Sequence, residues 1–198
     1  ILINDGSTDG TAGIIERYRR KDSRVRAYVQ PNRGLVASLN RGLELARGEY
    51  VARMDADDIS MPERVATQVA FLESHPDVGI CGTWIETIGM PHGSVRCYPT
   101  DDATIRSWLL FESVLAHPSI VMRRELLTKA GLSYDACYVH AEDYALWVRA
   151  ARHMALANIP GVLLRYRLHP HQVVQKHEAE KLASARLIRL AQLECLGI

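Results

Sequence analysis

Residues 49–58, Glu-Tyr-Val-Ala-Arg-Met-Asp-Ala-Asp-Asp, form an apolar strand-like segment that is followed directly by three carboxylates. In open α/β sheets, ligands bind beyond the carboxyl ends of the strands. We therefore expect Asp55, Asp57 and Asp58 at a binding site, where their mutual repulsion requires a nearby cation. Their hard oxygen ligands suit Mg²⁺ or Mn²⁺, and such ions often share the phosphates of a substrate. The alternative is a solvated acidic turn before the next helix, because an Asp-x-Asp sequence alone is weakly specific.

A second strand followed by polar residues opens the chain. Residues 1–3 are apolar enough for a buried parallel strand, and residues 4–11, Asn-Asp-Gly-Ser-Thr-Asp-Gly-Thr, indicate a turn into a helix. Gly6 allows the backbone to approach a ligand closely, and Ser7, Thr8 and Asp9 can cap the helix. Asp5 precedes the cap, at the carboxyl end of the strand, so capping does not account for it.

Together these segments resemble the inverting glycosyltransferases of family 2, which have the GT-A fold. The matching segments keep the family's order over about three quarters of the chain; they are residues 3–11, 32–35 (Asn-Arg-Gly-Leu), 39–42 (Leu-Asn-Arg-Gly), 46–50, 54–58 and 142–143 (Glu-Asp). The resemblance implies an α/β fold of the GT-A (nucleotide-diphospho-sugar transferase) type, with a mostly parallel sheet flanked by helices. Family members normally begin with an earlier strand and helix, so we expect an amino-terminally incomplete domain that lacks its first strand.

The resemblance also implies roles for individual residues. The donor-binding residues expected from it are Asp5, Gly6, Ser7, Asn32, Gly34, Arg53, Asp55 and Arg167. Asp57 is expected to bind Mn²⁺ or Mg²⁺ directly, and His169 to join that metal. Asp55 is expected to contact the ribose or to act through water.

Asp143 is the catalytic base by the same resemblance. A sugar hydroxyl is a poor nucleophile and must lose its proton as it attacks the anomeric carbon. The nucleoside diphosphate leaves from the opposite face while the metal neutralises its growing charge, so configuration is inverted. The alternative is that Glu142 and Asp143 only complement the dipole of the helix that they open.

Weaker candidates lie elsewhere in the chain. His117 precedes Pro118-Ser119 in a segment with a family counterpart, although a structural histidine at a turn is an equal alternative. Arg167 could bind phosphate, or the segment that contains it could simply end a strand before Pro170. Arg33 could approach the donor or be a solvated surface residue. Three tryptophans are candidates for stacking on an acceptor sugar or for the core: Trp84, Trp108 and Trp147.

Composition agrees with an ordinary globular protein. The 198 residues are 47% hydrophobic, enough for a sizeable core, and the net charge of +1 argues against nucleic acid as a partner. Four widely spaced cysteines have no metal-type spacing, and reduced thiols are expected. We expect residues 1–175 to form the GT-A domain and residues 176–198 a carboxyl-terminal helix. The protein is expected in the cytoplasm, and a position at the inner face of the membrane stays open.

Apolar periodicity and breaker residues predict alternating elements. Strands are expected over 25–29, 49–54, 78–88, 119–122 and 162–168. Helices are expected over 11–20, 35–46, 60–74, 100–110, 123–130, 142–152 and 176–195. The sequence Ser60-Met61-Pro62-Glu63 has the form of a capping box at the start of one helix.

The expected activity is transfer of a sugar from a nucleoside-diphosphate donor, commonly a uridine diphosphate sugar in this family, to a glycan or lipid-linked acceptor. Peripheral membrane contact and homo-oligomer formation stay open. One rival is an Asp-nucleophile phosphohydrolase, which leaves residues 4–11 and 142–143 unexplained; a nucleotidyltransferase is disfavoured because its Gly-rich basic loop is not visible. The other is a non-catalytic sugar-nucleotide or glycan-binding module, against which the carboxylates Asp55, Asp57 and Asp143 argue.

Overall fold

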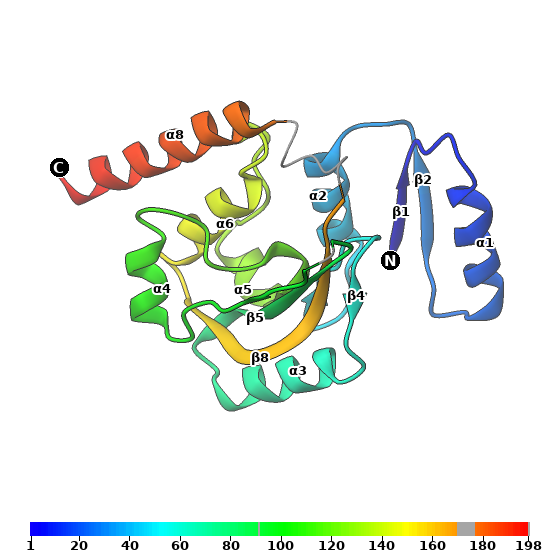
Figure 1. Cartoon of the computed structure of the whole chain (residues 1–198), viewed down its shortest axis with the longest axis horizontal. Helices are drawn as coiled ribbons and strands as arrows, with labels where there is room; N and C mark the ends of the chain where they lie inside the picture. Colours follow the sequence, from blue (N-terminus) through cyan, green and yellow to red (C-terminus); the bar gives the residue numbers. More distant parts are fainter. Residues whose placement is uncertain (91, 170–176, 198) are drawn as a thin grey trace. The chain divides into compact units, whose positions relative to one another are not determined.

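The computed structural model describes residues 1–90, 92–169 and 177–197. The chain divides into two compact units, Ile1–Gly48 and Glu49–Ile198. Figure 1 shows the elements of both units, coloured along the sequence.

The first unit is a small parallel α/β arrangement. Strands β1 (Leu2–Asp5) and β2 (Ala27–Gln30) pair in parallel, with Asp5 opposite Gln30 at the carboxyl ends. Helix α1 (Thr11–Lys21) connects the strands, and α2 (Leu35–Leu45) follows the second one. A parallel pair places the carboxyl ends of both strands at one edge, so the loops after β1 and β2 are neighbours.

The second unit contains a larger, mixed sheet. In the described residues it has six strands: β3 (Tyr50–Ala52), β4 (Ile59–Ser60), β5 (Val78–Ile88), β6 (Val95–Arg96), β7 (Val121–Arg123) and β8 (Ala155–Arg167). Their order is β3-β7-β5-β8-β4, and β6 pairs with β5. The long central pair β5/β8 is parallel, whereas the other pairings of this sheet are antiparallel. The expected mostly parallel sheet is therefore corrected to a mixed one, because the short strands β4, β6 and β7 run against their neighbours.

Helices cover both faces of this sheet. The described helices of the unit are α3 (Arg64–Ser74), α4 (Asp102–Trp108), the 3-10 helix η1 (His117–Ser119), α5 (Arg124–Lys129), α6 (Glu142–Ala150) and α8 (Glu178–Leu196). Figure 1 shows the curved strand β8 between α3 on one side and α6 on the other. Leu72 of α3 and the sheet residues Val78 and Val121 share one buried cluster. Trp147 of α6 is fully buried, which places it in the core and not on a sugar.

Buried amides fasten the loops at the ends of the strands. The Gln68 side chain donates hydrogen bonds to the carbonyl oxygens of Cys81 (2.7 Å) and Ser119 (2.9 Å). The Asn158 side chain donates to those of Pro99 (2.8 Å) and Val114 (3.0 Å). Unpaired carbonyl groups are costly in a core, so these amides hold the loops that lead to α4 and β7 in place.

Two local expectations are corrected by the structure. The capping box at Ser60 does not form: Ser60 pairs with Leu164 in β4, and the helix begins at Arg64 without a side-chain cap. The strand expected over 162–168 begins at Ala155, because a register shift between β5 and β8 accommodates the insertion of Pro160 and Gly161.

The helix expected over 176–195 is observed as α8, from Glu178 to Leu196. No helix in the described part of the chain is both long and apolar enough to span a membrane.

Candidate functional site

Asp5 is the centre of a hydrogen-bond cluster in the first unit. Its carboxylate accepts hydrogen bonds from the Gln30 side chain (2.7 Å) and from the backbone amides of Arg33 and Gly34 (both 2.9 Å). Burial raises the pKa of Asp5, but these hydrogen bonds and one with Ser38 outweigh it and hold the pKa below its ordinary value. The Asp5 carboxylate is thus ionised at neutral pH and orders the loop after β2.

The two glycines of this cluster, Gly6 and Gly34, have positive φ angles, which residues with a side chain rarely adopt. Gly6 has a φ of 81°, and a Cβ there would meet the Asn32 backbone nitrogen at 2.8 Å. Gly34 has a φ of 85°, and its amide also donates to the Asn32 side chain (3.1 Å). The Ser7 amide donates to the Asn4 side chain (2.8 Å). The sequence-predicted residues 5–7, Asn32 and Gly34 therefore do come together, with the two loops packed against each other.

Sequence reasoning missed Gln30, which links the parts of this cluster. Its amide donates to Asp5 and to the Ser38 hydroxyl (3.0 Å), and its carbonyl accepts from the Arg41 guanidinium. A hollow of about 600 Å³ on β2 and α2 is lined by Gln30, Arg33 and Arg41, among others. The signal that could have identified Gln30 is the one used for Asp5, its position at the carboxyl end of a parallel strand.

In the second unit, Arg53 provides a cation for the Asp-x-Asp segment. Its guanidinium makes a bidentate ion pair with Asp55, with nitrogen–oxygen distances of 2.7 and 2.5 Å. The Arg53 side chain is only 9% exposed, so the pair is partly desolvated. The structure thus places Arg53 and Asp55 side by side, and their roles in donor binding stay predictions.

Asp57 lies beside the end of β8. Its carboxylate Oδ2 is 3.4 Å from His169 Nε2, and its backbone carbonyl accepts a hydrogen bond from Arg167 Nε (2.7 Å). Antiparallel pairing of β4 with β8 causes this proximity, because Ile59 stands opposite Arg165. The structure thus brings together the two residues that were predicted as metal ligands and the predicted donor-binding arginine.

Asp58 is the buried member of the acidic segment. It is 7% exposed, and Oδ1 accepts a hydrogen bond from the Arg167 amide (2.8 Å), whereas Oδ2 is buried and makes no hydrogen bond with the described residues. Burial raises the pKa of Asp58 to about 6, reinforced by the nearby charges of Asp55 and Asp57. A carboxylate oxygen left unpaired in a cluster of like charges fits the presence of a divalent cation.

Asp57 and His169 offer donor atoms that suit a divalent ion. Asp57 Oδ2 and His169 Nε2 have the separation of two ligands on one ion, and both side chains are partly exposed, 44% and 39%. Open positions are what Mg²⁺ and Mn²⁺ need in order to keep waters and bind phosphates.

Glu142 and Asp143 open helix α6. Glu142 is 7% exposed, and burial raises its pKa. Burial also raises the pKa of Asp143 to about 6, and the adjacent Glu142 charge adds to the shift. The Tyr144 amide, which donates to Asp143 (2.7 Å), and the positive charges of Lys181 and Arg53 act in the opposite direction. A carboxyl group with such a pKa exchanges protons readily near neutral pH, as a general base requires.

The charge of Arg53, which pairs with Asp55, also acts on Glu142 and Asp143. Its charge opposes the pKa rise at Glu142, Asp143 and Asp58 alike. The acidic segment after β3 and the start of α6 therefore share one electrostatic environment within the second unit.

His117 packs against two aromatic side chains, Tyr134 and Trp147. Its Nε2 is 2.8 Å from the Tyr134 hydroxyl, and its ring packs edge-on against Trp147. Burial lowers the pKa of His117 well below its usual value, and the Arg53 charge adds to this. A neutral, hydrogen-bonded imidazole agrees with the structural interpretation of His117.

Arg64 was not identified from the sequence. It is 2% exposed and donates to the Ser60 hydroxyl (2.8 Å) and to the carbonyl oxygens of Arg53 (3.3 Å) and Pro118 (3.5 Å). It thereby ties the start of α3 to the end of β3 and to η1. No sequence signal indicates this role, because arginines in amphipathic helices normally face solvent.

The remaining tryptophans take different positions. Trp84 donates from its indole nitrogen to the Tyr98 carbonyl (3.0 Å), whereas Trp108 is 46% exposed at the end of α4. Trp108 is thus the tryptophan whose exposure permits contact with another molecule.

Known proteins resemble this chain in sequence and structure. The family model described as "Glycosyl transferase family 2" matches residues 1–131. The amylovoran biosynthesis glycosyltransferase AmsE of Erwinia amylovora is 32% identical over 171 residues, which cover 84% of this chain and 63% of AmsE. The chain spans about three fifths of the length of the first curated relatives that it matches.

Two solved structures share the fold. That of S. aureus TarS 1-349 in complex with UDP-GlcNAc aligns with a TM-score of 0.75 at 20% identity, covering 94% of this chain and 55% of that one. The mannosyltransferase PcManGT from Pyrobaculum calidifontis, in complex with GDP-Man and Mn²⁺, aligns with a TM-score of 0.64 at 21% identity, covering 92% and 52%. These likenesses establish the GT-A type of fold that the sequence predicted.

Proposed function

The chain belongs to glycosyl transferase family 2, and on that basis we propose that it transfers a sugar from a nucleoside-diphosphate donor to an acceptor hydroxyl with inversion of configuration. The observation that carries the proposal is Asp143, a partly buried carboxyl at the start of α6, whose pKa is raised to about 6. Such a group is largely ionised at neutral pH yet basic enough to accept the proton of a sugar hydroxyl.

We assign donor binding to two groups of residues. The loops after β1 and β2, with Asp5, Gly6, Ser7, Asn32 and Gly34, present an ordered polar surface for the nucleotide. Arg53, Asp55 and Arg167 in the second unit are the remaining donor-binding residues. The UDP-GlcNAc in the TarS complex supports a uridine diphosphate sugar as donor. A relative from Escherichia coli, 28% identical over 155 residues, is named a UDP-Gal:alpha-D-GlcNAc-diphosphoundecaprenol beta-1,3-galactosyltransferase, and this name supports both that donor class and a lipid-linked glycan acceptor.

A divalent cation fits the acidic segment. Asp57 and His169 would hold Mn²⁺ or Mg²⁺, which when bound neutralises the charge of the departing diphosphate. The Mn²⁺ named in the PcManGT complex supports this choice of ion. The role of the protein's own residues is positional: Arg53 orients Asp55, and the Arg167 amide orients Asp58.

The test is a screen of nucleoside-diphosphate sugars with Mn²⁺ or Mg²⁺, with released nucleoside diphosphate as the readout. Asp143→Asn keeps the shape of the side chain but removes its basic oxygen. We expect this variant to lose kcat by roughly 10² to 10⁴, the usual scale of general base catalysis, and to keep its donor affinity.

Three outcomes would contradict the proposal or part of it. A protein that binds the donor but releases no nucleoside diphosphate with any acceptor is a binding module. Full activity in Asp143→Asn, together with loss in Glu142→Gln, would move the base to the neighbouring carboxylate. A phosphorylated aspartate on Asp55 or Asp57 would instead favour the phosphohydrolase.

A further inference from the structure

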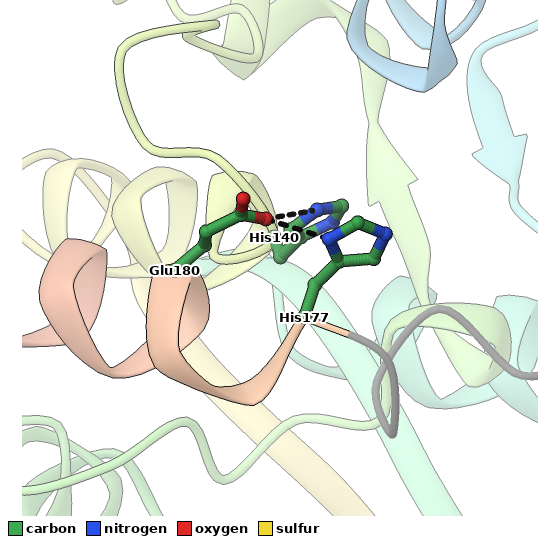
Figure 2. A group of neighbouring side chains, drawn as sticks. All are labelled: His140, His177 and Glu180. Atoms are coloured by element: carbon green, nitrogen blue, oxygen red, sulfur yellow. Dashed lines mark hydrogen bonds and ion pairs between the residues drawn. The ribbon is translucent and has the colours of Figure 1, made fainter.

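Two histidines and a glutamate converge where the loop before α6 meets the start of α8 (Figure 2). The carboxylate Oε2 of Glu180 is 2.7 Å from His177 Nδ1 and 3.3 Å from His140 Nε2. The two imidazole rings stack with their centroids 4.4 Å apart. Both histidines are partly buried, and Glu180 is exposed in the first turn of α8. Glu180 Oε2 thus contacts two imidazoles, which come from different parts of the chain.

We propose that His140, His177 and Glu180 bind a single Zn²⁺ ion. One ligand atom from each residue lies within 4.8 Å of the others. Tetrahedral zinc with bonds of about 2.0–2.1 Å places its ligands roughly 3.3 Å apart, the separation observed between His140 and Glu180. The His177–Glu180 separation of 2.7 Å is that of a hydrogen bond, and it must lengthen when the ion binds. Two imidazoles with one carboxylate form a zinc ligand set that leaves a fourth position for water.

The backbone of His140 provides a second observation. His140 has a φ of 58°, and it is the only non-glycine residue with a positive φ in the described part of the chain. Histidine adopts this left-handed conformation at a cost in free energy, and such strain concentrates at functional sites. In this conformation the His140 ring lies beside the Glu180 carboxylate (Figure 2).

The site differs in chemistry from the Asp57–His169 pair. Imidazole-rich sets favour Zn²⁺ and its transition-metal neighbours, whereas sets dominated by carboxylates and water favour Mg²⁺ and Mn²⁺. The proposal is also independent of the proposed function, because ion binding is measured without any transfer reaction.

A bound ion would act as a cross-link near the start of α6. His140 lies three residues before Asp143, and His177 and Glu180 lie at the start of α8. The charge of Lys181, in the same turn, already opposes the rise in the pKa of Asp143 and Glu142. Zinc would therefore fix the turn of α8 that carries this lysine to the loop that enters α6.

The experiment uses the full chain after removal of metals with a chelator. Zn²⁺ is titrated calorimetrically in an excess of Mg²⁺, which occupies the hard-oxygen site. We expect one equivalent of Zn²⁺ with micromolar or tighter affinity and a rise in Tm on addition of the ion, since an ion that binds only the folded state stabilises it. Co²⁺ in place of Zn²⁺ should give the visible absorption of a tetrahedral site.

The variants are chosen to preserve the backbone. His140→Asn removes the imidazole but keeps a residue that tolerates positive φ, and His177→Asn keeps a good residue at the N-cap of α8. Each should weaken Zn²⁺ binding by at least 10-fold, as should Glu180→Gln, because even residues that only support metal ligands cost 10–100-fold. The matched controls, His153→Asn and Glu178→Gln, change an exposed histidine and an acidic residue of the same turn and should bind as the unchanged protein does.

The proposal is overturned if Zn²⁺ does not bind, or if it binds equally well to the His140 and His177 variants. A lower Tm for the metal-free variants without Zn²⁺ binding to the parent would show that the three residues form only a hydrogen-bonded contact, which also overturns it.

Discussion

Asp143 lies in surroundings that favour its protonated form. Its folded-state pKa of about 6 exceeds the ordinary value of 3.8, with burial as the largest cause. A carboxyl whose pKa is raised by folding stabilises the protein fully at low pH, and this contribution is lost as pH rises through about 6. At neutral pH the site thus retains an ionised carboxyl at a cost in stability, a common feature of functional sites.

The Asp143→Asn variant tests this cost without any activity assay. Asparagine stays neutral at every pH, so we expect the variant to be more stable than the parent at pH 8 by roughly 1 to 2 kcal/mol, a discounted share of about two pKa units. The difference should shrink as pH falls below 6. Thermal unfolding of both proteins across pH 4.5–8 measures it, and a gain that is independent of pH would contradict the raised pKa.

Asp57 is the residue on which we expect metal binding to depend. With Asp55 and Asp58 it forms a cluster that would repel a diphosphate in the absence of a cation. Calorimetry should therefore show weak nucleoside-diphosphate binding with chelator and tighter binding with Mn²⁺, and Asp57→Asn should lose most of that gain. Asp77→Asn, an exposed aspartate after α3, is the control. Equal affinity with and without Mn²⁺ would contradict the assignment.

Candidate side chains could be predicted where strand ends and family-like motifs coincide, as for Asp5, Asp57 and His169. Asp143 was predicted from a family-like motif at the start of a helix, and the roles of all four residues stay predictions. Arg64 was not predicted, because its role depends on acceptors that come from two distant segments. Sequence periodicity carries no information on such long-range hydrogen bonds.

At the scale of elements, local pattern predicted helices better than strands. The helices predicted over 11–20, 35–46 and 60–74 have apolar faces and clear ends, and each is observed within a few residues, the third beginning four residues later than predicted. Only the second half of strand β8 was predicted, because Pro160 and Gly161 are residues that normally end a strand. The structure tolerates them at a register shift, a tertiary effect that the local sequence does not encode.

Helix α3 supports the loops of the site through one amide. Gln68 is fully buried, and its two hydrogen bonds hold the carbonyl groups of Cys81 in β5 and Ser119 in η1. We expect Gln68→Leu, which keeps the volume but removes the donor, to lower the free energy of unfolding by about 1–3 kcal/mol. Urea unfolding measures the change. Thr67→Ala, at the exposed neighbouring position, should change stability by less than about 0.5 kcal/mol. Equal effects of the two substitutions would show that the buried amide has no special role.

The whole molecule combines two units of very different construction. In the first unit, α1 and α2 contain no buried residue and the sheet has two strands. In the second unit, β5 is buried along most of its length and pairs with β8 over ten positions. The sequence predicted the fold class but not this division, because the apolar faces of α1 and α2 resemble those of helices in a well-packed core.

This contrast predicts unequal local stability. Two-stranded sheets are marginal by themselves, and segments with few buried contacts open with free energies far below that of global unfolding. We expect the amides of β1 and β2 to exchange with deuterium much faster than those of β5 and β8 at neutral pH. Because the Asp5 cluster belongs to the first unit and is proposed to bind the nucleotide, UDP with Mn²⁺ should slow exchange in β1 and β2. Asp5→Ala should abolish that protection while leaving exchange in β5 unchanged. Uniform protection across both units, or protection by UDP that persists in Asp5→Ala, would contradict this view of the molecule.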